Sequence, residues 1–149
     1  MLKAHPVKVP VELLAMNGED HYSAGGEMAY LGGHAGRLGE IRLAINVDGA
    51  GYRGSPNEIS FYDCPQIECD LALAEMKKYA SIREGVIWYQ SDHMVFAMNQ
   101  VPAIALTTAA FMDMETEIAH TEKDIPELVD LSLLVDIARF LDAFISRLE

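Results

Sequence analysis

The residues best suited to chemistry in this sequence follow apolar stretches. Glu19 and Asp20 come directly after VKVPVELLAMNG (7–18), and Asp48 follows EIRLAINV (40–47). Carboxylates at the carboxyl ends of buried strands lie where open α/β sheets place their ligand sites. Adjacent residues that leave a strand point in different directions, so one acid of the pair can bind a metal while the other holds a proton. The alternative is a solvated acidic turn for the pair and a turn-forming Asp before Gly for Asp48.

Among the histidines, His120 in AHTEKD is the best placed to join these carboxylates. Imidazole nitrogen and carboxylate oxygen are ligands that zinc takes, and an acidic chain without a Cys cluster leaves such groups available. His34 in GGHAG is interpreted as a loop histidine, because this stretch lacks the context of a phosphate-binding loop. Asp92 and His93 form either a carboxylate–histidine pair that orients a ligand or a helix start capped by Asp92.

The elements that must position these residues alternate between strand and helix patterns. The stretch from Val7 to Tyr22 is interpreted as a buried strand that ends in a charged loop, and the remaining strands are predicted over 40–47, 58–63, 85–89 and 101–107. Helices are predicted over 27–31, 65–80, 94–100 and 131–148. Without repeats or linkers, the pattern predicts one α/β domain over residues 1–149.

Composition narrows the class of protein. The chain has 149 residues, 50% of them hydrophobic, and a formal net charge of -12. An acidic protein of this kind is not expected to bind nucleic acid or an anionic membrane. No apolar stretch is long enough to span a bilayer and the start lacks a secretion-signal pattern, so we expect a cytoplasmic protein. In that compartment Cys64 and Cys69 are expected to be reduced, structural thiols.

Four motifs, taken in order, are similar to those of a known family. NGED after an apolar stretch, INVDGAG, SDHMVF followed by VPAIALTT, and AHTEKDIPELVD before a terminal helix resemble the two-zinc aminopeptidase family of zinc-dependent exopeptidases, which also includes glutaminyl cyclases. The resemblance covers nearly the whole chain. It implies a three-layer α/β fold with a mostly parallel or mixed sheet and helices on both faces.

The resemblance also implies a role for each candidate residue. Glu19 matches the general base that takes a proton from the attacking water. Asp20 matches a ligand of one zinc, with Asp in place of the more usual Glu, and Asp48 matches the acid of the Asn-x-Asp motif that binds the other zinc. His120 matches the histidine of His-Thr-x-x-Asp, a ligand of the first zinc. Two zinc ions and a peptide substrate, cleaved at its N-terminus, are therefore what the resemblance implies.

Part of the family pattern has no counterpart here. The family carries, before its acidic pair, a strand ending in His-x-Asp and a bridging Asp, whereas the only earlier histidine in this sequence is His5, in His-Pro-Val. This leaves fewer than the three protein ligands expected of a catalytic zinc site. We therefore expect the C-terminal part of such a catalytic domain, missing its N-terminal strands. Its open sheet is expected to be covered by a second copy or a complementary chain.

Two classes of function follow. The first is a zinc-dependent aminopeptidase-like hydrolase whose metal site another chain completes. The alternative is a non-catalytic assembly or binding module on the same scaffold, and a third interpretation is an acyltransferase or cyclase, because a fold does not fix its chemistry.

Overall fold

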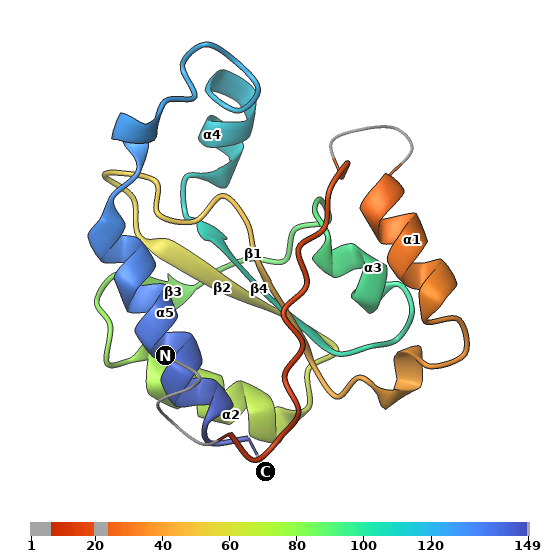
Figure 1. Cartoon of the computed structure of the whole chain (residues 1–149). Coiled ribbons are helices and arrows are strands. Elements are labelled where there is room, and N and C mark those ends of the chain that lie inside the picture. Colours follow the sequence, from red (N-terminus) through yellow and green to blue (C-terminus); the bar gives the residue numbers. More distant parts are fainter. Residues whose placement is uncertain (1–6, 20–23, 149) are drawn as a thin grey trace.

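A mixed four-stranded sheet runs through the centre of the molecule (Figure 1). The computed structural model describes residues 7–19 and 24–148. The strands are β1 (Ala44–Val47), β2 (Asn57–Tyr62), β3 (Ile82–Glu84) and β4 (Ala103–Thr108), in the spatial order β1-β4-β2-β3. β4 pairs in parallel with β1 and antiparallel with β2, and β2 pairs in parallel with β3. The mixed α/β sheet that the sequence predicts is confirmed.

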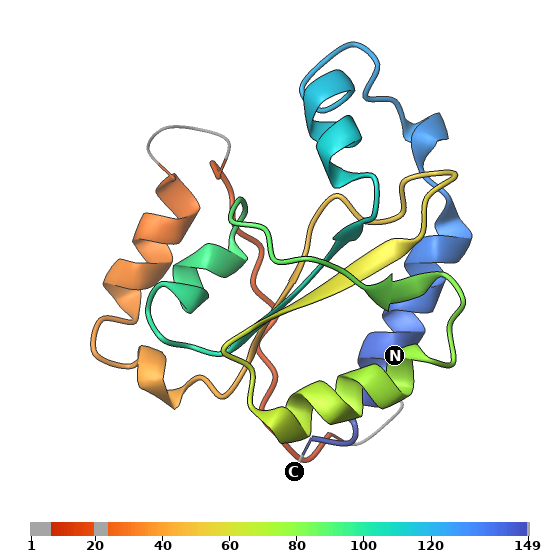
Figure 2. The same cartoon turned by 180° about the vertical axis from the view of Figure 1, so that it is seen from behind.

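Helices lie on both faces of this sheet. They are α1 (Gly25–Gly33), α2 (Gln66–Met76), α3 (His93–Ala97), α4 (Phe111–Glu117) and α5 (Leu131–Ile145), with 3-10 turns η1 (Leu38–Glu40) and η2 (Pro126–Leu128). α2 and α5 lie on one side of the sheet and α1 and α3 on the other (Figures 1 and 2). The expected three layers are therefore present. None of the helices in the described ranges is long and apolar enough to cross a bilayer.

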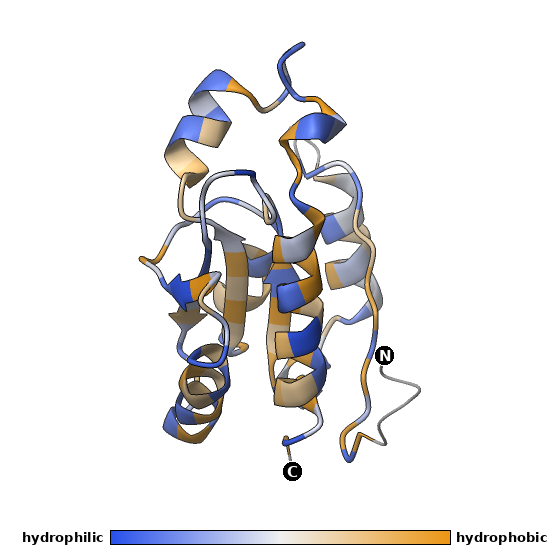
Figure 3. Ribbon diagram, turned by 90° about the vertical axis from the view of Figure 1, so that its left-hand side faces the viewer, coloured by the Kyte–Doolittle hydropathy of each residue, from blue (hydrophilic) through white to orange (hydrophobic). Residues whose placement is uncertain are grey.

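The strand β4 divides the core in two, because successive side chains of a strand point to opposite faces. Ile104 and Leu106 are fully buried in the cluster that α2 and α5 cover. Ala103 and Ala105 face the other cluster, which includes Trp88. Apolar colour is prominent on the strands at the centre of the molecule in Figure 3. Burial on both faces explains why β4 is apolar from Ala103 to Leu106, and the predicted strand at 101–107 is confirmed.

The N-terminal stretch departs from the prediction. Residues 7–17 are extended but form no strand, and residues 10–15 are exposed, with Leu13 85% exposed. An apolar run becomes a buried strand only where a neighbouring strand accepts its backbone hydrogen bonds, and in the described part of the chain β1 pairs with β4 alone. Val9 packs against the main core. The buried strand predicted from Val7 to Tyr22 is therefore wrong for 7–19, and residues 20–23 lie outside the described residues.

The strand predicted over 85–89 is displaced to β3. Gly85 N still donates to Ile59 O, but the chain that follows is bound by side chains of β2 in place of its backbone. Ser60 Oγ donates to Val86 O at 2.6 Å, and Tyr62 Oη donates to the carbonyl of Trp88 at 2.6 Å. The segment thus runs along β2 without ladder bonds and is not a strand.

Most other elements match their predictions within a few residues. The helices predicted over 65–80 and 94–100 are the shorter α2 and α3, and the helix predicted over 27–31 is the longer α1. α5 begins after Asp130, whose carboxylate accepts hydrogen bonds from the backbone N and the hydroxyl of Ser132. These bonds hold the pKa of Asp130 below its usual range.

The two cysteines are free thiols at the start of α2. Burial raises the pKa of Cys64 to about 12, with the neighbouring thiol of Cys69 adding to the effect. A thiol with so high a pKa is unreactive at neutral pH. The structural interpretation of this pair agrees with its environment.

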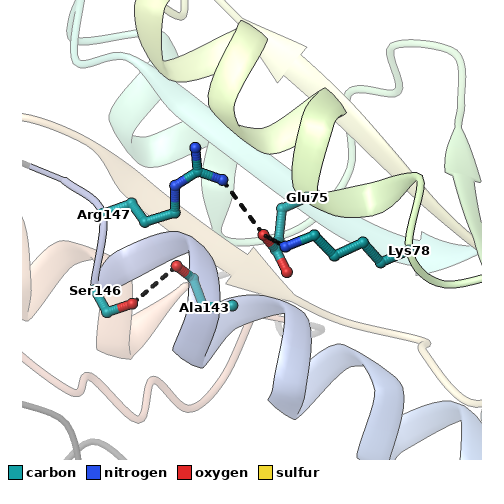
Figure 4. A network of polar contacts seen from close by, with 5 residues as sticks. All are labelled: Glu75, Lys78, Ala143, Ser146 and Arg147. Atoms are coloured by element: carbon teal, nitrogen blue, oxygen red, sulfur yellow. Dashed lines mark hydrogen bonds and ion pairs between the residues drawn. The ribbon is translucent and has the colours of Figure 1, made fainter.

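An ion pair joins α2 to the end of α5 (Figure 4). Glu75 is buried to 2% exposure, and its carboxylate accepts from Lys78 Nζ at 2.6 Å and pairs with Arg147 Nη1 at 3.5 Å. Both cations remain largely exposed, so only the carboxylate loses its water. A buried charge held in this way fixes the two helices of one layer relative to each other.

Candidate active site

Three of the four predicted site residues line one cleft. Glu19, Asp48 and His120 come from the end of the N-terminal segment, the loop after β1 and the turn after α4, and they border a cleft of about 570 Å³. In Figure 1, α4 stands at the end of the sheet where β4 ends. Because β1 is parallel to β4, Asp48 leaves the sheet at this same end. Asp20 lies outside the described residues.

Asp48 is positioned by the last step of the β1–β4 ladder. Its backbone N donates to Leu106 O at 3.0 Å, so the chain turns into the loop directly afterwards. Gly49 has a φ of +62°, and a Cβ there would lie 2.5 Å from Met114 Cε and 3.1 Å from Thr107 Oγ1. Only glycine therefore lets the loop turn here while α4 packs against it. This explains the Asp-Gly sequence without reference to any ligand.

His120 lies on an exposed turn that is tied back to the loop after Asp48. The residue has a φ of +59°, in the left-handed region that non-glycine residues rarely adopt. Beyond it, the guanidinium of Arg53 donates to the carbonyls of Glu127 at 2.9 Å and Val129 at 3.3 Å. These bonds hold the segment that follows His120 against the loop that carries Asp48.

A buried polar network forms one wall of the cleft. Asn46 Nδ2 donates to Ser91 Oγ at 2.9 Å and lies 3.4 Å from His93 Nδ1. His93 Nε2 lies 3.1 Å from the carbonyl of Trp88. His93 is fully buried, and burial lowers its pKa from 6.5, so the imidazole is neutral at physiological pH. Ser91 has a φ of +85°.

This network was only partly visible in the sequence. The sequence offers Asp92 and His93 as a pair, but His93 faces Asn46 and the carbonyl of Trp88, so the pair does not act as one unit. Asn46 belongs to the Asn-x-Asp motif, and that motif is the signal that could have marked it. No sequence pattern marked Ser91, since its role depends on a contact with a residue 45 positions away.

Asp92 occupies the first position before α3, as predicted, but its side chain makes no capping hydrogen bond. It lies beside Glu27 of α1 and lines the cleft. Burial raises the pKa of Glu27, and the neighbouring carboxylate of Asp92 raises it further. Glu27 is therefore protonated more readily than an isolated glutamate at the boundary between α1 and α3.

The described residues alone do not assemble a metal centre. Within 7–19 and 24–148, no three His, Cys, Asp or Glu side chains come close enough together to hold an ion. The cleft does supply carboxylate and imidazole donors of the kind that zinc takes. The donor types fit zinc, but among the described residues fewer than three of these donors lie close enough together to bind one ion.

The sequence model of peptidase family M28 matches residues 1–145. The chain belongs to peptidase family M28. The fold of this M28 chain is similar to that of the aminopeptidase from Aneurinibacillus sp. strain AM-1, with a TM-score of 0.66 and 16% sequence identity. The match covers 87% of this chain and 31% of that aminopeptidase. The M28 chain therefore spans about a third of the length of this structural neighbour.

A comparison with curated protein sequences gives no match. Membership of family M28 supports a peptidase-like function, and the structural likeness shows the fold. The roles of Glu19, Asp20, Asp48 and His120 remain predictions.

Proposed function

We propose that this M28 chain is a zinc-dependent aminopeptidase-like hydrolase that acts on peptide N-termini through the cleft described above. The observation that supports the proposal is the meeting of Glu19, Asp48 and His120, which are far apart in the sequence, on one cleft. An apolar core or an acidic surface does not require a carboxylate, a second carboxylate and an imidazole to border the same space. A metal-dependent catalytic site does require such groups to border the same space.

Each residue has a defined task in this proposal. Asp20 and His120 would hold one zinc ion and Asp48 would hold the other, and Glu19 would take and return the proton of the attacking water. Bound zinc supplies a Lewis acid that polarises the peptide carbonyl. Further ligands come from a second copy, a complementary chain or additional residues of a longer protein. We propose a cytoplasmic location for this hydrolase as well.

The second candidate is a non-catalytic assembly or binding module. It is favoured by one observation: the described residues bring no three metal-binding side chains together. The unpaired outer edge of β1 in the described chain would then serve to add a strand from a partner.

Hydrolysis separates the two candidates. We would assay a panel of aminoacyl anilides with the wild-type chain and Glu19→Gln in the presence of zinc. Glu12→Gln is the matched control, because Glu12 lies in the same N-terminal segment and does not line the cleft. The proposal expects turnover in the wild type and in Glu12→Gln, and a loss of at least about 100-fold in Glu19→Gln. Equal rates in all three proteins, or no turnover with added zinc, would favour the module.

A further inference from the structure

The carbonyl of Trp88 decides the orientation of the buried network beside the cleft. It accepts a hydrogen bond from Tyr62 Oη at 2.6 Å, and it has no proton to give to His93 Nε2, which lies 3.1 Å away. A carbonyl oxygen and a bare ring nitrogen at that distance repel each other. His93 therefore carries its proton on Nε2 and donates it to Trp88 O.

The tautomer of His93 fixes the amide of Asn46. With the proton on Nε2, the ring nitrogen Nδ1 is an acceptor, so the group that faces it at 3.4 Å is the NH2 of Asn46. The same NH2 donates to Ser91 Oγ at 2.9 Å. Both amide protons are thereby directed into the protein wall.

The opposite side of the amide is left facing the cleft. Oδ1 lies on the far side of a planar amide from Nδ2, and Asn46 lines the cleft two residues before Asp48. In the described chain Oδ1 neither has a hydrogen-bond donor nor is among the fully buried polar atoms. It is a solvent-accessible acceptor in a fixed direction.

We propose that Ser91 and His93 hold the side-chain amide of Asn46 so that Oδ1 accepts a hydrogen bond from an N–H group of a bound peptide. Asn46 is then a residue that determines specificity, and Ser91 and His93 are positioning residues. Ser91, which contacts Asn46, has a left-handed backbone, and backbone strain of this kind is common at binding sites. The ligand in this proposal rests on the proposed peptidase function, whereas the orientation of the amide does not.

The orientation is tested by nitrogen-15 NMR of the imidazole rings in the full chain. We expect His93 as the Nε2–H tautomer and a pair of slowly exchanging Asn46 side-chain protons, whose exchange accelerates in Ser91→Ala. A His93 ring protonated on Nδ1 would overturn the proposal, because Asn46 would then turn its oxygen inward and its NH2 toward the cleft.

The ligand is tested by titrating the zinc-supplemented chain with L-leucinamide. Asn46→Leu, which keeps the size but removes the acceptor, is expected to bind about three- to tenfold more weakly than the wild type. Asn99→Leu is the matched control, because Asn99 lies on the turn after α3 away from the cleft, and it should bind like the wild type. Equal binding by Asn46→Leu, or no binding by the wild type, would overturn the ligand assignment. Whether the chain is a zinc-dependent hydrolase at all is measured separately, by its zinc content and its turnover of aminoacyl anilides.

Discussion

Replacing Asn57 by Asp is expected to destabilise the loop that carries Asp48. Asn57 is fully buried, and its Oδ1 accepts a hydrogen bond from Gly51 N at 2.9 Å. Its Nδ2 donates to Leu133 O, the first turn of α5, at 3.3 Å. One amide therefore ties the loop after β1 to the last helix. Asp keeps the first bond but places a second carboxylate oxygen against the Leu133 carbonyl.

The expected cost follows from these two contacts. Losing the bond to Leu133 removes about 1 kcal/mol. Burying a carboxylate beside an unpaired carbonyl adds about 1 to 3 kcal/mol. The free energy of unfolding of Asn57→Asp should therefore fall by about 2 to 4 kcal/mol. For a chain of this length that corresponds to a Tm lower by roughly 4 to 16 °C.

Thermal and urea unfolding, followed by circular dichroism, measure this loss. Gln100→Glu is the control, because it is the same amide-to-acid change at an exposed position and should shift the Tm by less than about 2 °C. Burial raises the pKa of the introduced acid, so the protonated form, which can donate to Leu133 O, should regain stability relative to wild type as the pH falls. An Asn57→Asp midpoint equal to that of the control at every pH would show that the Asn57 amide does not stabilise the loop against α5.

Three other predictions test the surroundings of the site. Burial lowers the pKa of His93 below 6.5, so as the pH falls the unfolded chain binds a proton on this imidazole before the folded chain does. The stability present above pH 6.5 should therefore be lost as the pH falls. His93→Gln should remove this part of the dependence of unfolding free energy on pH, measured by urea melts between pH 7 and 5. A slope unchanged by the substitution would count against a neutral imidazole. Glu75→Gln, which removes the charge bound by Lys78, should lower the free energy of unfolding by about 2 kcal/mol, measured by urea titration, and an unchanged midpoint would contradict it. Gly85→Ala would place a Cβ 2.6 Å from Glu58 Cβ, and a calorimetric loss of about 1 to 3 kcal/mol is expected; no loss would show that β2 yields freely.

The sequence predicts an element best where the residue pattern of that element alone shows which of its faces are buried. The apolar residues of β4 indicate a strand without knowledge of its neighbours, because both faces of that strand are covered. The spacing of apolar residues along α5 likewise indicates which side of the helix is buried. The stretch at 7–17 has the same apolar character but is not a strand. Hydrophobicity alone does not specify whether a neighbouring strand is present to pair with it.

The sequence offers candidate residues for the site but not the contacts that support them. Asp48 follows a predicted strand and His120 lies in the AHTEKD motif, and the parallel pairing of β1 and β4 brings their loops to one end of the sheet. Asn57 and Arg53, which tie these loops together, are unmarked in the sequence because their partners lie 76 and 74 positions away. Contacts at such separations depend on topology, which local patterns do not encode.

The amount of zinc bound per chain shows most directly whether the cleft is a metal site. Protein prepared without chelator and reloaded with zinc would be analysed by mass spectrometry for the wild type, Asp48→Asn and His120→Ala, with His34→Ala as control because His34 lies at the end of α1 outside the cleft. From the assignment of the cleft as a metal site we expect up to about two zinc ions per wild-type and control chain, and affinity reduced by at least about tenfold in each cleft variant. Zinc absent from the wild type after reloading, or retained equally by all four proteins, would contradict it.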